Sequence, residues 1–156
     1  MRPSMVAPEG ATTPEQLELA TVFAEYGPLT EAMYLMMSAD GTISDEEREV
    51  LRGALKNLSD DAVRTHQIEA LMEAAKKSVD AEGRQNRIKT VASELREDPA
   101  RAEVAFVLAA AIAFADGAIA DDENETLNTM AEYMSIDESK ANQLLDDVEA
   151  DMLRAT

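Results

Sequence analysis

The sequence contains no cysteine, no tryptophan and a single histidine, His66. Without cysteine there are no disulfides, no thiolate catalysis and no Cys-ligated zinc site, so nothing in the chain requires an oxidising compartment. One histidine also rules out a histidine-rich metal site. Because no cysteine and no nearby Ser-Asp arrangement accompanies His66, a nucleophilic triad has little support, and a surface or half-buried structural role is favoured.

Basic residues and long hydrophobic runs are scarce as well. Lys and Arg together number 14 against 32 Asp and Glu, which gives a formal net charge of −18. A surface this negative repels phosphate backbones and anionic lipids, so nucleic acid is not an expected partner. The longest apolar run, residues 104–115, is well short of the ~20 residues that span a bilayer. We therefore expect a cytoplasmic protein that does not insert into membranes, and most of the acidic surface is explained by solubility alone.

The signatures of common enzyme classes are missing. The chain has no phosphate-binding glycine loop, no cofactor fingerprint and no evident nucleophile. Paired carboxylates can hydrolyse glycosides, but three Phe, three Tyr and no Trp argue against the aromatic platforms of such enzymes. We predict a non-enzymatic protein.

Helical patterns, in contrast, run through almost the whole chain. No alternating strand pattern interrupts them, and 156 residues suit one domain. We predict an all-α fold, a single-domain bundle of about eight helices over residues 13–156, preceded by a flexible tail over residues 1–12. Its helices should start at N-cap residues and capping boxes, which lie at Thr13-Gln16, Ser44-Glu47, Asp98-Pro99 and Asp137.

Other signals predict where helices end. Gly27-Pro28 is expected to stop the first helix near Tyr26 and to start a second one. Ser59-Asp60-Asp61 is expected to cap a further helix, which Gly83 ends. The helix that covers residues 104–115 is apolar on nearly every face, so it should be the central helix of the bundle.

One segment occurs twice. Asp40 to Glu47 returns as Asp116 to Glu123, displaced by 76 positions (116 minus 40), with Asp, Gly, Ile and Glu in the same register. Each copy follows an apolar helix and leads into an acidic one. The unit is helix, Asp-Gly turn, helix, and its duplication predicts an internal pseudo-two-fold.

The repeated acids match only half of a calcium-binding EF-hand loop. If the Asp of each copy occupies the fifth loop position, the first and third positions fall on Met36 and Ser38, and on Ile112 and Phe114. An EF-hand needs oxygen ligands at both positions, and Met, Ile and Phe supply none. The repeat is therefore not a working EF-hand.

Two interpretations of the repeated acids remain open. If the two-fold brings the turns together, a divalent cation could be bound by Asp40, Glu47, Asp116 and Glu123, with Glu46 and Asp122 as acidic neighbours. All-oxygen ligation would favour calcium, magnesium or manganese over zinc or copper. In the other interpretation no metal is needed, because the glycines end helices, the aspartates accept turn hydrogen bonds and the glutamates cap the next helices. In the second copy Ala120 replaces Ser44, so Asp121 is expected to serve as the cap.

The doubled helix, Ala-Asp-Gly-x-Ile turn and acidic helix resembles the TerB family, named for tellurite-resistance operons, from about Leu17 to Met152. The resemblance implies an all-helical, non-enzymatic domain of bacterial stress-response or membrane-associated complexes. It also implies an acidic cluster suspected of binding divalent cations. The resulting hypothesis is a cation-responsive interaction module, and its alternative is a metal-free structural or self-association domain.

A local basic segment stands out in this acidic chain, formed by Lys76, Lys77, Arg84, Arg87 and Lys89. A solvated helix face is the favoured interpretation. Docking of an acidic partner protein, or of another copy's acidic face, is the alternative.

Overall fold

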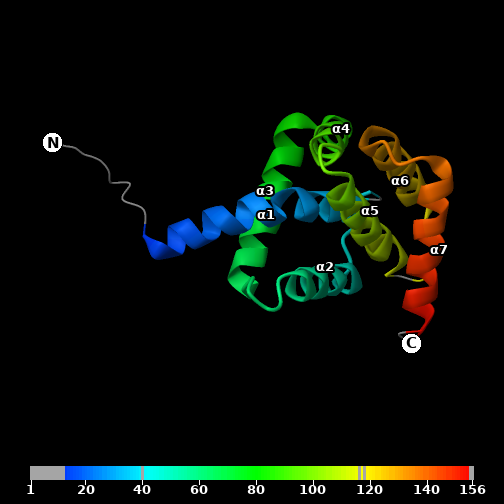
Figure 1. The fold of residues 1–156 in the computed structure, drawn as a ribbon. Coiled ribbons are helices and arrows are strands. Elements are labelled where there is room, and N and C mark those ends of the chain that lie inside the picture. Colours follow the sequence, from blue (N-terminus) through cyan, green and yellow to red (C-terminus); the bar gives the residue numbers. More distant parts are fainter. Residues whose placement is uncertain (1–12, 40, 116, 118, 155–156) are drawn as a thin grey trace.

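The computed structural model describes residues 13–39, 41–115, 117 and 119–154. Over these residues the chain is all-helical, as predicted, and contains no strand. The helices are α1 (Pro14–Met37), α2 (Asp45–Leu58), α3 (Thr65–Glu82), α4 (Arg84–Leu95), α5 (Pro99–Phe114), α6 (Asp121–Met134) and α7 (Glu138–Arg154) (Figure 1). The expected flexible tail, residues 1–12, lies outside the described residues.

The prediction that Gly27-Pro28 separates two helices is wrong. Helix α1 runs through Pro28 without a break, which is why the described chain has seven helices rather than about eight. Proline in a helix interior costs about 3 kcal/mol, but every residue from Leu29 to Met37 is buried, and this burial outweighs that cost. Arg101 of α5 donates a hydrogen bond to the Glu25 carbonyl oxygen, in the turn where the proline ring disturbs the helix ladder.

The expected cap at Ser59-Asp60-Asp61 also takes a different role. Ser59 ends α2, and Asp60 and Asp61 adopt positive φ values of 55° and 64°. The Asp61 N–H donates to the Lys56 carbonyl oxygen at 2.8 Å. Aspartate tolerates the left-handed conformation, so this signal closes α2, and α3 starts only at Thr65.

The packing of the helices follows the sequence repeat. Helices α2 and α6 are displaced by the same 76 positions at both ends (121 minus 45 and 134 minus 58). Helix α1 packs against α5, α2 reaches across to α5, and α6 reaches across to α1. In the same way α3 packs on α1 and α7 on α5, while α4 joins the two halves (Figure 1). This is the arrangement expected of two related three-helix units.

The core lies where α1 and α5 cross. Helix α5 packs against α1, α2, α4, α6 and α7, which agrees with its predicted central place. The second half of α1 shares that place, because it is buried on all sides. No described helix combines the length and the hydrophobicity that crossing a bilayer requires.

Replacing a core leucine should therefore cost far more than replacing a surface leucine of the same helix. Leu35 is fully buried, so Leu35→Ala should lower the free energy of unfolding by about 2 to 5 kcal/mol. Leu17 is 57% exposed, and Leu17→Ala should change it by less than about 0.5 kcal/mol. Urea unfolding followed by circular dichroism measures both. Equal losses in the two variants would contradict the central position of α1.

Candidate functional site

The glycines of the two Asp-Gly turns have similar backbone geometry. Gly41 and Gly117 both adopt positive φ, 85° and 112°. The Gly41 N–H donates to the Ser38 carbonyl oxygen at 3.1 Å, and the Gly117 N–H donates to the Phe114 carbonyl oxygen at 2.9 Å. Both glycines are therefore needed for their backbone conformation, as the sequence predicted.

Each turn is followed by a buried glutamate at the third position of the next helix. The Glu47 carboxylate accepts a hydrogen bond from the Ser44 N–H at 2.9 Å, and that of Glu123 accepts one from the Ala120 N–H at 2.8 Å. The residues are only 2% and 6% exposed. Both glutamates lie at the positive end of a helix dipole, which stabilises their negative charge. The predicted capping role of the two glutamates is confirmed.

The second copy keeps only half of the capping box. In the first copy the Ser44 hydroxyl accepts a hydrogen bond from the Glu47 N–H at 3.1 Å, completing the reciprocal pair. Ala120 occupies the equivalent N-cap position and has no side-chain oxygen to accept one. Asp121 is the first residue inside α6, so the expectation that it would serve as the cap is wrong. At the start of α6 only the second half of the capping box is left, in which the Glu123 carboxylate accepts a hydrogen bond from the Ala120 N–H.

The described part of the structure does not bring the remaining predicted ligands together. Asp40 and Asp116 lie outside them, and Glu46 and Asp122 are exposed at the second position of their helices. Within the described ranges, no three acidic or histidine side chains are arranged to hold a metal. The cation site at the two turns stays a prediction. Met36 and Ile112, in contrast, are fully buried, which agrees with the exclusion of an EF-hand.

The first turn lies beside the start of α6, from the other half of the molecule. Ala39, Arg84, Asp122 and Thr126 line one small cavity there. Arg84 donates hydrogen bonds to the Leu35 carbonyl oxygen at 2.6 Å and to the Thr126 hydroxyl at 3.2 Å. Burial lowers the pKa of the Arg84 guanidinium, and the negative charge of Asp122 opposes that shift. The chain therefore places one of its own cations at the C-terminal end of α1, next to the first turn.

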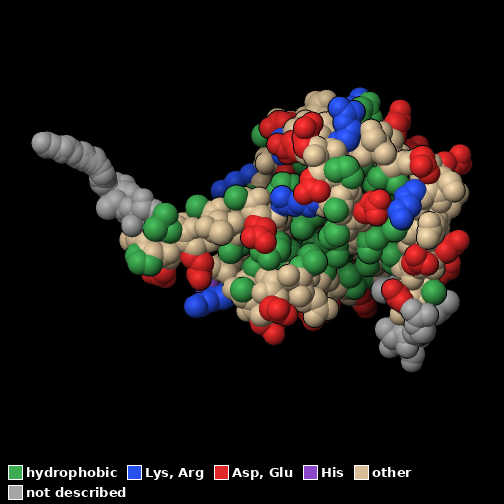
Figure 2. Space-filling model, viewed as in Figure 1, with side chains coloured by type: hydrophobic (Ala, Val, Ile, Leu, Met, Phe, Trp, Pro, Cys, Tyr) green, Lys and Arg blue, Asp and Glu red, His purple; other side chains and the backbone are tan. Residues whose placement is uncertain are grey.

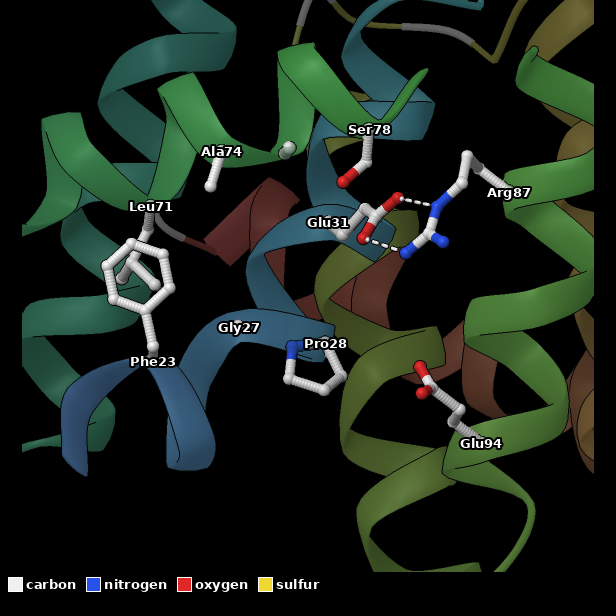
Figure 3. Close-up of a pocket in the computed structure, with 10 residues that line it drawn as sticks. Phe23, Gly27, Pro28, Glu31, Leu71, Ala74, Ser78, Arg87 and Glu94 are labelled. Atoms are coloured by element: carbon white, nitrogen blue, oxygen red, sulfur yellow. Dashed lines mark hydrogen bonds and ion pairs between the residues drawn. The ribbon is translucent and has the colours of Figure 1, made fainter. Parts of the chain in front are cut away.

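An ion pair between the half-buried Arg87 and the buried Glu31 joins α4 to α1 (Figure 3). Arg87 donates two hydrogen bonds to the Glu31 carboxylate, at 2.6 and 2.7 Å, and a third to Glu82 at 3.1 Å. The hydrogen bond to Glu31 raises the pKa of the Arg87 guanidinium above its usual value. A cavity of about 240 Å³ opens beside the pair, with Phe23 and Leu71 at its apolar end. Arg87 and Glu31 satisfy each other, so the pair joins α4 to α1 beside this cavity.

The basic segment is therefore only partly a solvated face. Lys76 pairs with Asp80 at the surface, at 3.0 Å. Arg84 and Arg87 instead turn inward, and the Lys89 amine lies 5.8 Å from the centre of the Tyr133 ring. Two features of the sequence could have indicated that these arginines turn inward. Glu31 is the only charged residue in the buried run 29–37, and Arg84 and Arg87 lie in the first turn after Gly83.

Breaking the Glu31–Arg87 pair should be costly because it leaves a buried charge alone. Arg87→Met should lower the free energy of unfolding by about 3 to 5 kcal/mol, and adding Glu31→Met should restore most of it. The control Lys76→Met removes an exposed pair and should leave the urea midpoint nearly unchanged. A double variant as unstable as Arg87→Met would contradict this account of the pair.

Comparison with known proteins agrees with the doubled motif. No curated protein and no solved structure matches the chain. A family model described as tellurite resistance protein TerB matches residues 29–146, which is more than half of the chain and includes both Asp-Gly turns. The chain belongs to the TerB family.

Proposed function

We propose that this TerB domain binds a divalent cation at its Asp-Gly turns and, in the loaded form, acts as a protein-interaction module. One observation carries the proposal. Two carboxylates, Glu47 and Glu123, are buried at equivalent places, at the third position of the helix that follows each turn. The family description names tellurite resistance, and the setting we propose for this role is tellurite or stress response.

The burial of these glutamates exceeds what capping needs. A glutamate can reach back to an N-cap amide while it remains in solvent, as Gln16 does in the exposed capping box of α1. A buried carboxylate loses hydration, and the loss must be compensated by hydrogen bonds, the helix dipole or a nearby cation. The first two contributions are present at Glu47 and Glu123. A bound cation would strengthen this compensation.

The donor chemistry fits a hard cation. Glu47 and Glu123 offer carboxylate oxygens, and Asp40 and Asp116 precede them by seven positions in each copy (47 minus 40 and 123 minus 116). Oxygen-only ligands suit calcium, magnesium or manganese. When bound, the cation would tie each helix end to the start of the next helix and so fix the surface that α2 and α6 present to a partner.

The second candidate is a metal-free structural or self-association domain. It is favoured by the fact that both glutamates already accept an N-cap hydrogen bond. In that case the charge of the glutamates would matter little, and any side chain that keeps the same hydrogen bond should replace them. The two candidates therefore differ in what a glutamine can do.

A thermal melt in EDTA and then in ~1 mM calcium, magnesium or manganese separates the candidates. At free metal ~100 times the dissociation constant, binding adds about 2.7 kcal/mol, which is a rise of several degrees in Tm for a chain of this size. Glu47→Gln with Glu123→Gln keeps an oxygen for the Ser44 and Ala120 amides but removes the charges. This variant should remain folded and lose the rise, as should Asp40→Asn with Asp116→Asn.

The matched control is Asp60→Asn with Asp61→Asn. It also removes two negative charges, at an exposed turn where asparagine tolerates the positive φ. The control should keep the rise in Tm. A wild-type Tm that none of the three ions raises, or an equal rise in all variants, would reject the cation site and leave the metal-free domain.

A further inference from the structure

The connecting helix α4 covers a groove in one half of the molecule only. Besides the central helix α5, α4 packs against both α1 and α6 and buries its own apolar face there. The buried residues of that face are Ile88, Val91, Ala92 and Leu95. The groove between α1 and α6 is thus filled by an amphipathic helix.

The equivalent groove in the other half lies between α5 and α2. Since α1 corresponds to α5 and α6 to α2, a helix placed like α4 would pack against both α2 and α5. Among the described helices, only the central helix α1 packs extensively against both. The α5/α2 groove therefore has no described counterpart of α4.

The lack of a described counterpart of α4 leaves one face of α2 less buried than the equivalent face of α6. Thr126, Met130 and Met134 of α6 are buried, at 5%, 1% and 3% exposure. Their counterparts 76 positions earlier on α2 are two half-buried residues and one that is 43% exposed, namely Val50, Ala54 and Leu58. Equivalent faces of the two helices therefore differ, because the face of α6 is buried and that of α2 is partly exposed to solvent.

Helix α5 shows the same asymmetry. Ala32 and Leu35 of α1 are fully buried, whereas their counterparts Leu108 and Ala111 are only partly buried. One turn earlier on α5, Val104 is 37% exposed. Val104, Leu108 and Ala111 follow the i, i+4, i+7 spacing of one helix face. Figure 2 shows hydrophobic side chains gathered over the region between α2 and α5.

We propose that this open groove, formed by Val50, Ala54, Leu58, Val104, Leu108 and Ala111, binds a basic amphipathic helix of about three turns from a partner protein. Helix α4 indicates the apolar part of the chemistry, because it occupies the equivalent groove with an apolar face. The partners of its arginines, Glu31 and Thr126, correspond to Val107 and Val50 in the open groove, so the basic character of the occupant is argued from the acidic surface around the groove. The proposal goes beyond cation binding and does not depend on it.

Charge supports a basic occupant. In the filled groove Arg84 of α4 lies beside Asp122 of α6. The counterpart of Asp122 on α2 is Glu46 (122 minus 76), an exposed carboxylate at the end of the open groove. With a net charge of −18 the chain also attracts basic segments over a longer range. A basic helix would therefore gain both apolar contact and charge complementarity.

A peptide copy of α4 is the direct probe. A fluorescent, acetylated and amidated peptide of residues 83–97 is titrated with the full chain, with fluorescence anisotropy as the readout. Leu58→Arg with Val104→Arg places cations at two exposed groove positions and should weaken binding by roughly tenfold or more. Leu17→Arg alters an exposed leucine of α1 outside the groove and should leave the affinity unchanged. Circular dichroism melts confirm that each variant is folded.

Amide NMR shifts locate the peptide, and they should change at the groove residues of α2 and α5. The proposal is overturned by the absence of binding, by equal binding of a scrambled peptide, or by equal losses in Leu17→Arg. Shifts confined to α1 and α6 would mean that the peptide displaces the chain's own α4, and would overturn it too. So would light scattering that finds a dimer which Leu58→Arg with Val104→Arg dissociates, because the occupant would then be a second copy.

Discussion

The packing of α1 against α5 positions everything else in this domain. Each of the two helices ends in an Asp-Gly turn, so their crossing fixes where both turns lie. The helix after each turn then packs back across the opposite half, α2 on α5 and α6 on α1. That exchange is why Ala39 of the first turn and Asp122 of the second half line the same cavity. Residues 83 positions apart in the sequence (122 minus 39) thereby lie at one cavity, which a single helix-turn-helix unit could not provide.

Features set by neighbouring residues could be predicted from the sequence. The helix class, the Ser44-Glu47 capping box and the two glycine turns depend on contacts within about one helical turn, so local chemistry reveals them. Features set by distant contacts could not. Pro28 continues a helix because the residues after it are buried by other helices. The prediction for Ser59-Asp60-Asp61 is wrong for a local reason, because the same residues suit both the start of a helix and the left-handed turn that ends α2.

The features of the candidate site also separate into those set by neighbouring residues and those set by distant contacts. Sequence alone located Glu47 and Glu123 and assigned their capping role, but not their burial, which depends on packing. The inward positions of Arg84 and Arg87 depend on Leu35 and Glu31, which are 49 and 56 positions away. The open groove between α2 and α5 could likewise not be predicted from the repeat, because it depends on where α4 packs in the folded chain.

Paramagnetic broadening by Mn²⁺ tests most directly whether the two turns form a cation site. Manganese added well below one equivalent to ¹⁵N-labelled protein broadens the amide signals nearest to where it binds. The account predicts that the signals of Gly41 and Gly117 disappear first and together, while those of the exposed acids of α7 persist. Broadening spread evenly over the acidic surface, or strongest along α7, would contradict it.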